Sequence, residues 1–189
     1  MPNQELAYLK LFKEISKKIN SSLDMGEILR SITENIVKTL DAKGCAIFLL
    51  DKSKNRLLYS SSYGLSEDYV NKGQIDSEKS IVETLQGKWV LISDAQTDQN
   101  IQYRDEAKKE GILSILSGPM SVKGIVIGVI RIYASKPLDL SDVEKEFITG
   151  LAEIGSIGIE NARLYRHIKA DHEKLINDVH QWFDFGATK

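Results

Sequence analysis

The first forty residues alternate apolar and polar positions at the spacing of two amphipathic helices. In the first helix, apolar side chains recur every three or four residues with lysines between them, which is typical of a helix with one buried face. Its apolar positions are Leu6, Leu9, Phe12, Ile15 and Ile19. Asn20 to Ser22 interrupts this pattern. Asp24 and Glu27 then form a capping box, which predicts a second helix that ends near Gly44.

Short apolar runs separated by polar turns predict strands in much of the remaining chain. Residues 45–50 are a continuous apolar run of strand length. Residues 56–63 return after a polar loop, as the second arm of an antiparallel hairpin does. Residues 89–92 predict a further short strand. The stretch 114–134 predicts a strand, a turn and a strand, with a bend expected at Gly118-Pro119.

Capping and turn signals place short helices between these strands. Ser80 and Glu83 have the spacing of a capping box, which predicts a short helix. Residues 103–110 predict another helix, and Gly111 is expected to end it in the left-handed conformation. Residues 123–124, Lys-Gly, mark a tight turn between the last two strands.

The C-terminal part of the chain predicts a long helix with a heptad pattern. Ser141 and Glu144 form a capping box at its start, and two series of seam positions then recur every seven residues, offset by three. The seam consists of Leu151, Ile154, Gly158, Asn161, Tyr165, Ile168, His172, Leu175, Val179 and Trp182. The upstream half of this helix should also pack on its own domain. Beyond Tyr165 the chain is charged apart from this seam, which predicts a parallel contact between two chains and therefore a homodimer. The alternative is that the helix folds back on its own domain.

Composition narrows the class of protein. The chain has 189 residues, which suits one domain with extensions. Its 27 acidic and 25 basic residues are interleaved and give a net charge of -2, which favours neither nucleic acid nor an anionic membrane as a partner. A single cysteine indicates a reducing compartment. The N-terminus lacks a signal peptide, and no apolar run approaches the roughly 20 residues that span a bilayer. We therefore expect a soluble cytoplasmic protein.

The sequence contains no motif of catalysis, phosphate binding or metal binding that we recognise. Phosphate-binding glycine loops and the G-x-S-x-G nucleophile elbow are absent. Cys45 lies within an apolar strand, where a thiol stays neutral and structural. Asp94, Asp98 and Asp105 are loop carboxylates, which usually meet solvent or cap helices. The histidines are separated by five and eight residues, not by the four that bring two imidazoles to one metal. They are His167, His172 and His180.

Several pieces of the C-terminal half occur in a familiar order. They are a Ser- and Pro-containing strand at 114–120, an apolar run at 127–132, an acidic helix start at 140–144, and a helix at 151–165 that contains Ile-Glu-Asn-Ala. In this order they resemble the C-terminal half of a GAF domain, the small-molecule sensing module of signalling proteins. Gly118 departs from the pattern, because an apolar residue is more usual before the proline. The resemblance extends back to about residue 6.

The resemblance implies a fold and a division of the chain. The fold is α+β and related to PAS domains, with a roughly six-stranded antiparallel sheet, helices on both faces and a long C-terminal coiled-coil helix. The expected segments are an N-terminal helix at 1–22, the GAF domain at 23–165 and a helical extension at 166–189. In this family the ligand lies between the sheet and the segment that here spans 64–110.

We expect the ligand site to consist of strand and loop residues that meet on that face. Arg131 stands out because a charge within an apolar strand needs a partner, unless it points to solvent. The family's cyclic-nucleotide constellation cannot be assembled here, and the pocket region has neither a cysteine for a covalent bilin nor a histidine for haem. The cofactor is therefore unknown, with no metal, haem or bilin expected. The candidate ligand-binding residues are Phe48, Trp89, Ile92, Ser93, Tyr103, Ser114, Leu116 and Arg131.

These observations predict a non-catalytic sensory domain that binds an unidentified small molecule and relays the signal through dimeric terminal helices. The receiving partner would be a kinase, a cyclase or a transcription regulator, in the same chain or in another one. The first alternative is a ligand-free structural or dimerisation module, in which side chains such as Phe48, Trp89 and Tyr103 fill the cavity. The second alternative is a small enzyme on the same scaffold.

Overall fold

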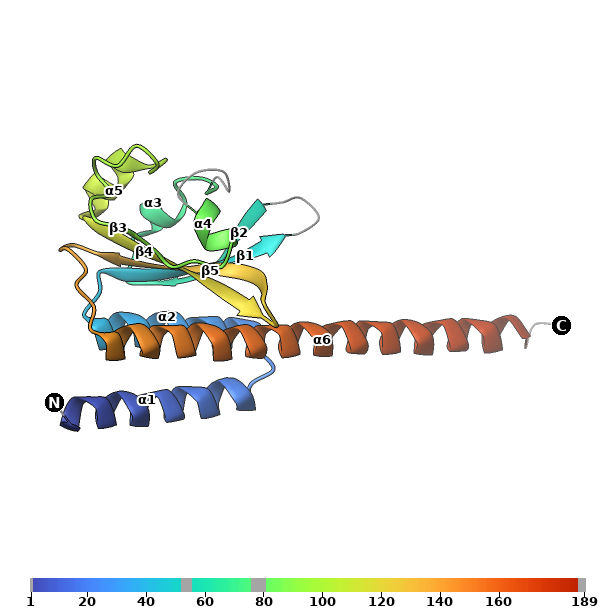
Figure 1. The fold of residues 1–189 in the computed structure, drawn as a ribbon. Helices are drawn as coiled ribbons and strands as arrows, with labels where there is room; N and C mark the ends of the chain where they lie inside the picture. Colours follow the sequence, from blue (N-terminus) through green and yellow to red (C-terminus); the bar gives the residue numbers. More distant parts are fainter. Residues whose placement is uncertain (1, 52–55, 76–80, 187–189) are drawn as a thin grey trace.

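One antiparallel sheet organises the chain, and helices cover both of its faces (Figure 1). The structure, a computed structural model, describes residues 2–51, 56–75 and 81–186, and side chains within these ranges from residue 5 to residue 177. The strands are β1 (Gly44–Asp51), β2 (Arg56–Tyr63), β3 (Val90–Ile92), β4 (Ser114–Val122) and β5 (Ile125–Ala134), in the order β2-β1-β5-β4-β3. The predicted α+β fold is confirmed, with five strands among the described residues where roughly six were expected.

The helices form two groups on opposite faces of the sheet. They are α1 (Pro2–Ser21), α2 (Met25–Leu40), α3 (Glu67–Val70), α4 (Val82–Leu85), α5 (Arg104–Glu110) and α6 (Asp142–Gly186). Figure 1 shows α2 and α6 beneath the sheet with α1 outside them, whereas α3, α4 and α5 lie above it with their loops. We call the two faces the helix side and the loop side.

Each face of the sheet has its own apolar core, because side chains alternate between the faces along each strand. On β5, Ile130 and Ile132 pack into the helix-side core, whereas Val129 and Tyr133 pack into the loop-side core. The same alternation places Arg131, between the two isoleucines, on the loop side.

The capping box predicted for the second helix is present, with one additional residue. The Asp24 carboxylate accepts a hydrogen bond from the Glu27 N–H at 2.9 Å. The Glu27 carboxylate accepts from the Ser22 hydroxyl at 2.8 Å, and the Asp24 N–H donates to Ser22 Oγ at 3.1 Å. The helix ends earlier than expected, because Asp41 adopts the left-handed conformation with φ of 51°, and Gly44 already begins β1.

The bend predicted at Gly118-Pro119 is wrong, because β4 continues through both residues and Pro119 pairs with Val129 of β5. Proline is tolerated there because β3 pairs with β4 only as far as Ser117, which leaves β4 with one neighbour beyond that point. The glycine has a packing reason. A Cβ at position 118 would lie 2.1–2.5 Å from ring carbons of Trp89.

Other predicted turns and caps that fall on described residues appear as expected. Lys123 and Gly124 form the turn between β4 and β5, with φ of 51° and 77°, and Gly111 ends α5 with φ of 76°. Ser80 lies outside the described residues. Helix α4 has Ile81 at its N-cap, without a side-chain hydrogen bond.

Helix α6 begins at the predicted capping box and packs on its own domain over its first turns. The Glu144 N–H donates to Ser141 Oγ at 3.3 Å, and the Glu144 carboxylate accepts from the Ser141 N–H at 2.8 Å. Leu151 is buried, and a Cβ at Gly158 would lie 2.6 Å from Cγ2 of Ile19. The first positions of the predicted seam therefore pack against the chain's own domain.

Beyond these turns, α6 projects away from the sheet (Figure 1). Its seam side chains are exposed there, for example Ile168 at 67% and Leu175 at 63%. The exposed seam positions are Asn161, Tyr165, Ile168, His172 and Leu175, whereas the side chains of Val179 and Trp182 lie outside the described part. No helix in the described ranges combines the length and apolar character that a membrane crossing requires.

Candidate ligand site

The candidate site lies on the loop side of the sheet, at the middle of β4 and β5. Arg131 pairs in register with Ser117 of β4 and with Ala46 of β1, so the two positions beside it hold small side chains. Tyr133 lies two residues further along β5 and shares the same face. Arg131 is therefore flanked across the sheet by two small side chains, Ala46 and Ser117.

Arg131 is a buried cation without an ionic partner among the described residues. Its exposed fraction is 5%, so it does not point to solvent, which was the alternative for this residue. Its Nε and Nη2 atoms are buried and make no hydrogen bond with any described group. The ring of Tyr133 lies 5.7 Å from Cζ of Arg131 and offers a weak cation–π contact. Buried charges are normally paired and hydrogen-bonded, so this guanidinium group lacks a usual partner.

Three hydroxyl groups on the loop side of the sheet are unsatisfied in the same way. Ser117 Oγ, Tyr133 Oη and Thr84 Oγ1 are buried and have no hydrogen-bond partner in the described ranges. Thr84 belongs to α4, which packs over β4 and β5 on this face. A buried polar group without a partner costs roughly 1–3 kcal/mol. Such groups gathered in one region indicate a place where a polar ligand can be held.

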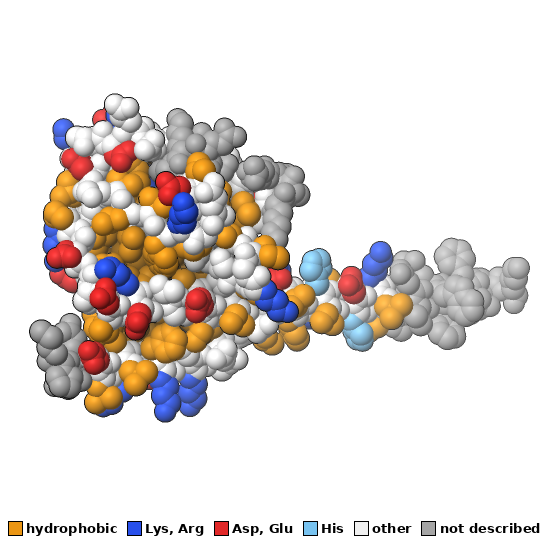
Figure 2. All heavy atoms as spheres, in the orientation of Figure 1, with side chains coloured by type: hydrophobic (Ala, Val, Ile, Leu, Met, Phe, Trp, Pro, Cys, Tyr) orange, Lys and Arg blue, Asp and Glu red, His pale blue; other side chains and the backbone are white. Residues whose placement is uncertain are grey.

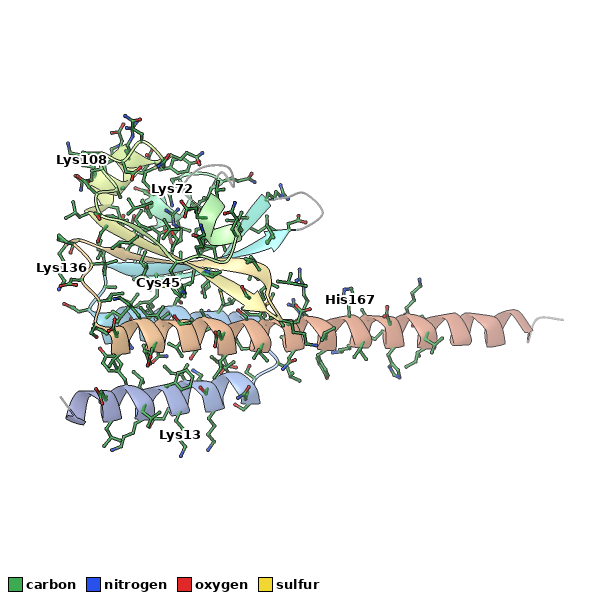
Figure 3. All side chains as sticks on the ribbon, viewed as in Figure 1. Lys13, Cys45, Lys72, Lys108, Lys136 and His167 are labelled. Carbon is green, nitrogen blue, oxygen red and sulfur yellow. The ribbon has the colours of Figure 1, made fainter. Side chains whose placement is uncertain are left out.

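A lysine and two tyrosines flank this cluster. The Tyr69 ring meets the Tyr133 ring edge-on, with centroids 5.5 Å apart. Lys72 Nζ lies 3.7 Å from the centroid of Tyr69 and donates to the Tyr69 carbonyl oxygen at 2.8 Å. Figure 3 shows Lys72 on the loop side of the sheet. The Tyr103 hydroxyl donates to the Gln74 carbonyl oxygen at 2.9 Å. Its ring lies 5.8 Å from Lys72 Nζ, at the rim of the cluster.

Burial lowers the pKa of Lys72 to about 8, and the charge of Arg131 acts in the same direction. Glu106 and Glu110 oppose this shift. Glu110 is engaged elsewhere, because its carboxylate accepts hydrogen bonds from the N–H and the hydroxyl of Ser66. The site therefore holds one permanent positive charge and a second one that is lost near pH 8.

The structure places the eight predicted ligand residues on both faces of the sheet and does not bring them together. Phe48 and Ile92 are buried in the loop-side core, and Arg131 lies on the same face. Trp89 and Leu116 pack against the helix-side core instead.

The remaining predicted residues have other surroundings. The hydroxyl of Ser114 donates to the Lys136 carbonyl oxygen at 2.6 Å, Ser93 is exposed, and Tyr103 is half-buried at the rim. Five residues of the site were missed by sequence reasoning. Tyr133 could have been found from its period-two spacing to Arg131, but the others required the strand register or the packing of short helices. They are Tyr69, Lys72, Thr84, Ser117 and Tyr133.

An apolar groove of about 390 Å³ lies on the helix side, between the sheet edge and the start of α6. Figure 2 shows apolar side chains gathered on the domain around this region. Trp89, Leu116 and Ile148 contribute to its lining. Trp89 therefore faces this groove and not the polar cluster around Arg131.

Other groups with chemical potential have structural surroundings. Burial raises the pKa of the Cys45 thiol, and the side chain lies in the helix-side core (Figure 3). Asp94 accepts a hydrogen bond from the Gln96 N–H at 2.9 Å, which lowers the pKa of its carboxyl group, and Asp98 accepts from the Asn100 N–H at 2.7 Å. Within the described ranges, no group of three or more metal-ligating side chains could hold a metal ion.

The chain is an α+β domain whose antiparallel sheet carries a polar cluster on one face and a long helix on the other. Residues 22–160 match the sequence profile of the GAF domain family, so the chain belongs to that family of signalling and sensory modules. No curated protein sequence matches the chain.

Solved structures with this fold include GAF domains of two phosphoenolpyruvate-protein phosphotransferases. The one from Coxiella burnetii is 20% identical, with a TM-score of 0.76 over 86% of this chain and 98% of that one. The one from Acinetobacter is 24% identical, with a TM-score of 0.70 over 82% and 94%. Free methionine-R-sulfoxide reductase from Neisseria meningitidis, in complex with its substrate, is 14% identical, with a TM-score of 0.70 over 85% and 93%. At these identities the likeness establishes the fold.

Proposed function

We propose that this chain is a non-catalytic sensory GAF domain that binds a small molecule on the loop side of its sheet and relays the signal through a dimer of α6. The observation that carries the proposal is the set of buried, unpaired polar atoms around Arg131. Because such atoms destabilise an empty domain, a ligand that pairs with them gains a favourable interaction. The family membership supports a sensory role.

The sheet offers a short route from the ligand site to α6. On β4, Ser117 faces the loop side, whereas its neighbour Leu116 packs into the helix-side core. Met120 also belongs to that core, and its methyl carbon lies 3.5 Å from where a Cβ at Gly155 of α6 would be. A shift of β4 on ligand binding would therefore change the packing of α6 on its own domain.

The exposed seam of α6 supports the dimer in this proposal. Tyr165, Ile168 and Leu175 are about half exposed or more and share one face at heptad spacing. A kinase, a cyclase or a transcription regulator, in the same chain or in another one, would read the geometry of the paired helices. Size-exclusion chromatography with light scattering should report a dimer for the unchanged chain and a monomer for the double variant Ile168→Glu, Leu175→Glu.

The double variant Ala170→Glu, Asn177→Glu is the matched control, because it adds the same two negative charges at exposed positions outside the seam. It should leave the dimer intact. If the double seam variant stays dimeric, the proposed relay through α6 is wrong.

The absence of catalysis in this proposal rests on the surroundings of the candidate groups. Cys45 is buried and its pKa is raised, which disfavours the reactive thiolate. The carboxylates of Asp94 and Asp98 accept backbone hydrogen bonds within turns.

A ligand-free dimerisation module is the second candidate, favoured by the burial of Phe48 and Ile92 in the loop-side core. Native mass spectrometry of the freshly purified chain separates the two. A dimer with an additional mass that is released on denaturation supports a ligand-binding sensor. A dimer without added mass, which also fails to bind any member of a metabolite library, supports the dimerisation module.

A further inference from the structure

The two unpaired nitrogens of Arg131 lie on one edge of its guanidinium group. The N–H bonds of Nε and Nη2 point the same way, and this pair forms the fork that donates to two oxygen atoms at once. A carboxylate matches the fork with two parallel hydrogen bonds. None of the described carboxylates forms an ion pair with this edge.

We propose that the loop-side site binds a small organic acid through its carboxylate, with Nε and Nη2 of Arg131 holding the two oxygens and the hydroxyls of Ser117 and Thr84 donating to them. The inference deepens the proposed function and rests on it. Ser117 stands directly across from Arg131 on β4, and Thr84 lies on the helix above both strands. An anion entering here would pair buried donors that are otherwise unsatisfied.

The charge and lining of the site favour a carboxylate over a phosphate. Arg131 offers unpaired donors, whereas Lys72 Nζ already donates to the Tyr69 carbonyl oxygen. One free guanidinium edge matches a single carboxylate group, whereas a phosphate dianion requires more charge beside it to offset its desolvation. The surroundings are apolar and aromatic, with Tyr69, Tyr133 and Phe48 in the same core. They suit a short organic body attached to the carboxylate.

Entry to the site requires movement of its cover, because the donor atoms are buried. Helix α4 is the part of the cover suited to move. It is a single turn of four residues, and its N-cap residue, Ile81, makes no side-chain hydrogen bond. A single turn has few hydrogen bonds to lose, so we expect α4 to shift without unfolding of the sheet.

The test titrates the purified chain with linear mono- and dicarboxylates of two to six carbons, with the corresponding primary amides, and with inorganic phosphate and sulfate. Binding is followed by isothermal titration calorimetry and by the rise in Tm. We expect at least one carboxylate to bind and its amide to fail. Arg131→Met should weaken that binding roughly 30-fold or more, because it removes a charged, bidentate partner. Ser117→Ala should weaken it several-fold, about the contribution of one hydrogen bond.

Two further variants complete the test. Arg131→Lys keeps the charge but loses the fork, so its affinity should fall between the unchanged chain and Arg131→Met. If Arg131→Met fails to fold, the comparison of Arg131→Lys with the unchanged chain tests the proposal instead. Arg30→Met removes an exposed arginine from α2 and should bind as the unchanged chain does.

Equal carboxylate binding by the unchanged chain and both Arg131 variants would overturn the proposal. So would binding of phosphate or sulfate without any carboxylate, or a complete failure of the carboxylate series. Native mass spectrometry separates these failures from failure of the proposed function. A bound neutral molecule would overturn the carboxylate assignment alone, whereas a chain that neither carries nor binds any small molecule would overturn both.

Discussion

Replacing Arg131 with methionine should stabilise the ligand-free domain, although the position is in the core. Two buried donor nitrogens of Arg131, Nε and Nη2, have no partner among the described residues, and each such group costs roughly 1–3 kcal/mol. Methionine keeps an unbranched apolar stem of similar reach and removes both donors together with the buried charge. The lost contact with the Tyr133 ring, 5.7 Å away, offsets at most about 2 kcal/mol, the magnitude for a desolvated pair. The net expectation is a gain of roughly 2 kcal/mol in the free energy of unfolding.

The assay is urea unfolding followed by far-UV circular dichroism, on protein from which any co-purified ligand has been removed by unfolding and refolding. For a chain of this length, a gain of roughly 2 kcal/mol corresponds to a rise in Tm of about 4–8 °C. Arg30→Met, at an exposed position, should change the free energy of unfolding by less than about 0.5 kcal/mol.

A clear loss of stability in Arg131→Met would refute the reasoning, because it would mean that the guanidinium group has a stabilising partner. The expected gain in stability accompanies the expected loss of carboxylate binding. A residue that costs stability and supplies binding is common at functional sites, where an unsatisfied group is kept for the ligand.

Three further predictions concern the scaffold and the electrostatics of the site. Gly118→Ala should lower the free energy of unfolding by about 1–3 kcal/mol in urea, because the added Cβ meets the Trp89 ring, and Trp89→Leu should recover part of the loss. Asp24→Ala should lower the free energy of unfolding by about 1 kcal/mol, because it removes the carboxylate that accepts the hydrogen bond from the Glu27 N–H, and Asp24→Asn should retain most of that stability. The pKa of Lys72 is lowered from 10.5 to about 8, so the folded chain binds fewer protons than the unfolded chain between these values. The free energy of unfolding of the unchanged chain should therefore rise from pH 8 to pH 10 relative to Lys72→Gln, and a difference that stays constant or falls would contradict the shift.

The sequence by itself determined the elements, because these depend on local spacing, and its resemblance to GAF domains implied the fold. Three- and four-residue periodicity gives α1, and the Asp24 and Ser141 caps fix where α2 and α6 begin. The short apolar runs give the strands, and Lys123-Gly124 gives the turn between β4 and β5. The heptad spacing likewise indicates which face of α6 is apolar beyond the domain.

The tertiary structure decided which face each strand residue serves and which residues meet. Trp89 and Arg131 were both candidates for one site, but they lie on opposite faces, because β3 pairs with β4 in a register that sets the Trp89 ring against Gly118. The register of β4 against β5 brings Ser117 opposite Arg131. Pro119 suggested a bend from its local chemistry, but an unpaired stretch of strand edge accommodates it. Strand register and packing depend on contacts between residues far apart in the chain, so local spacing does not predict them.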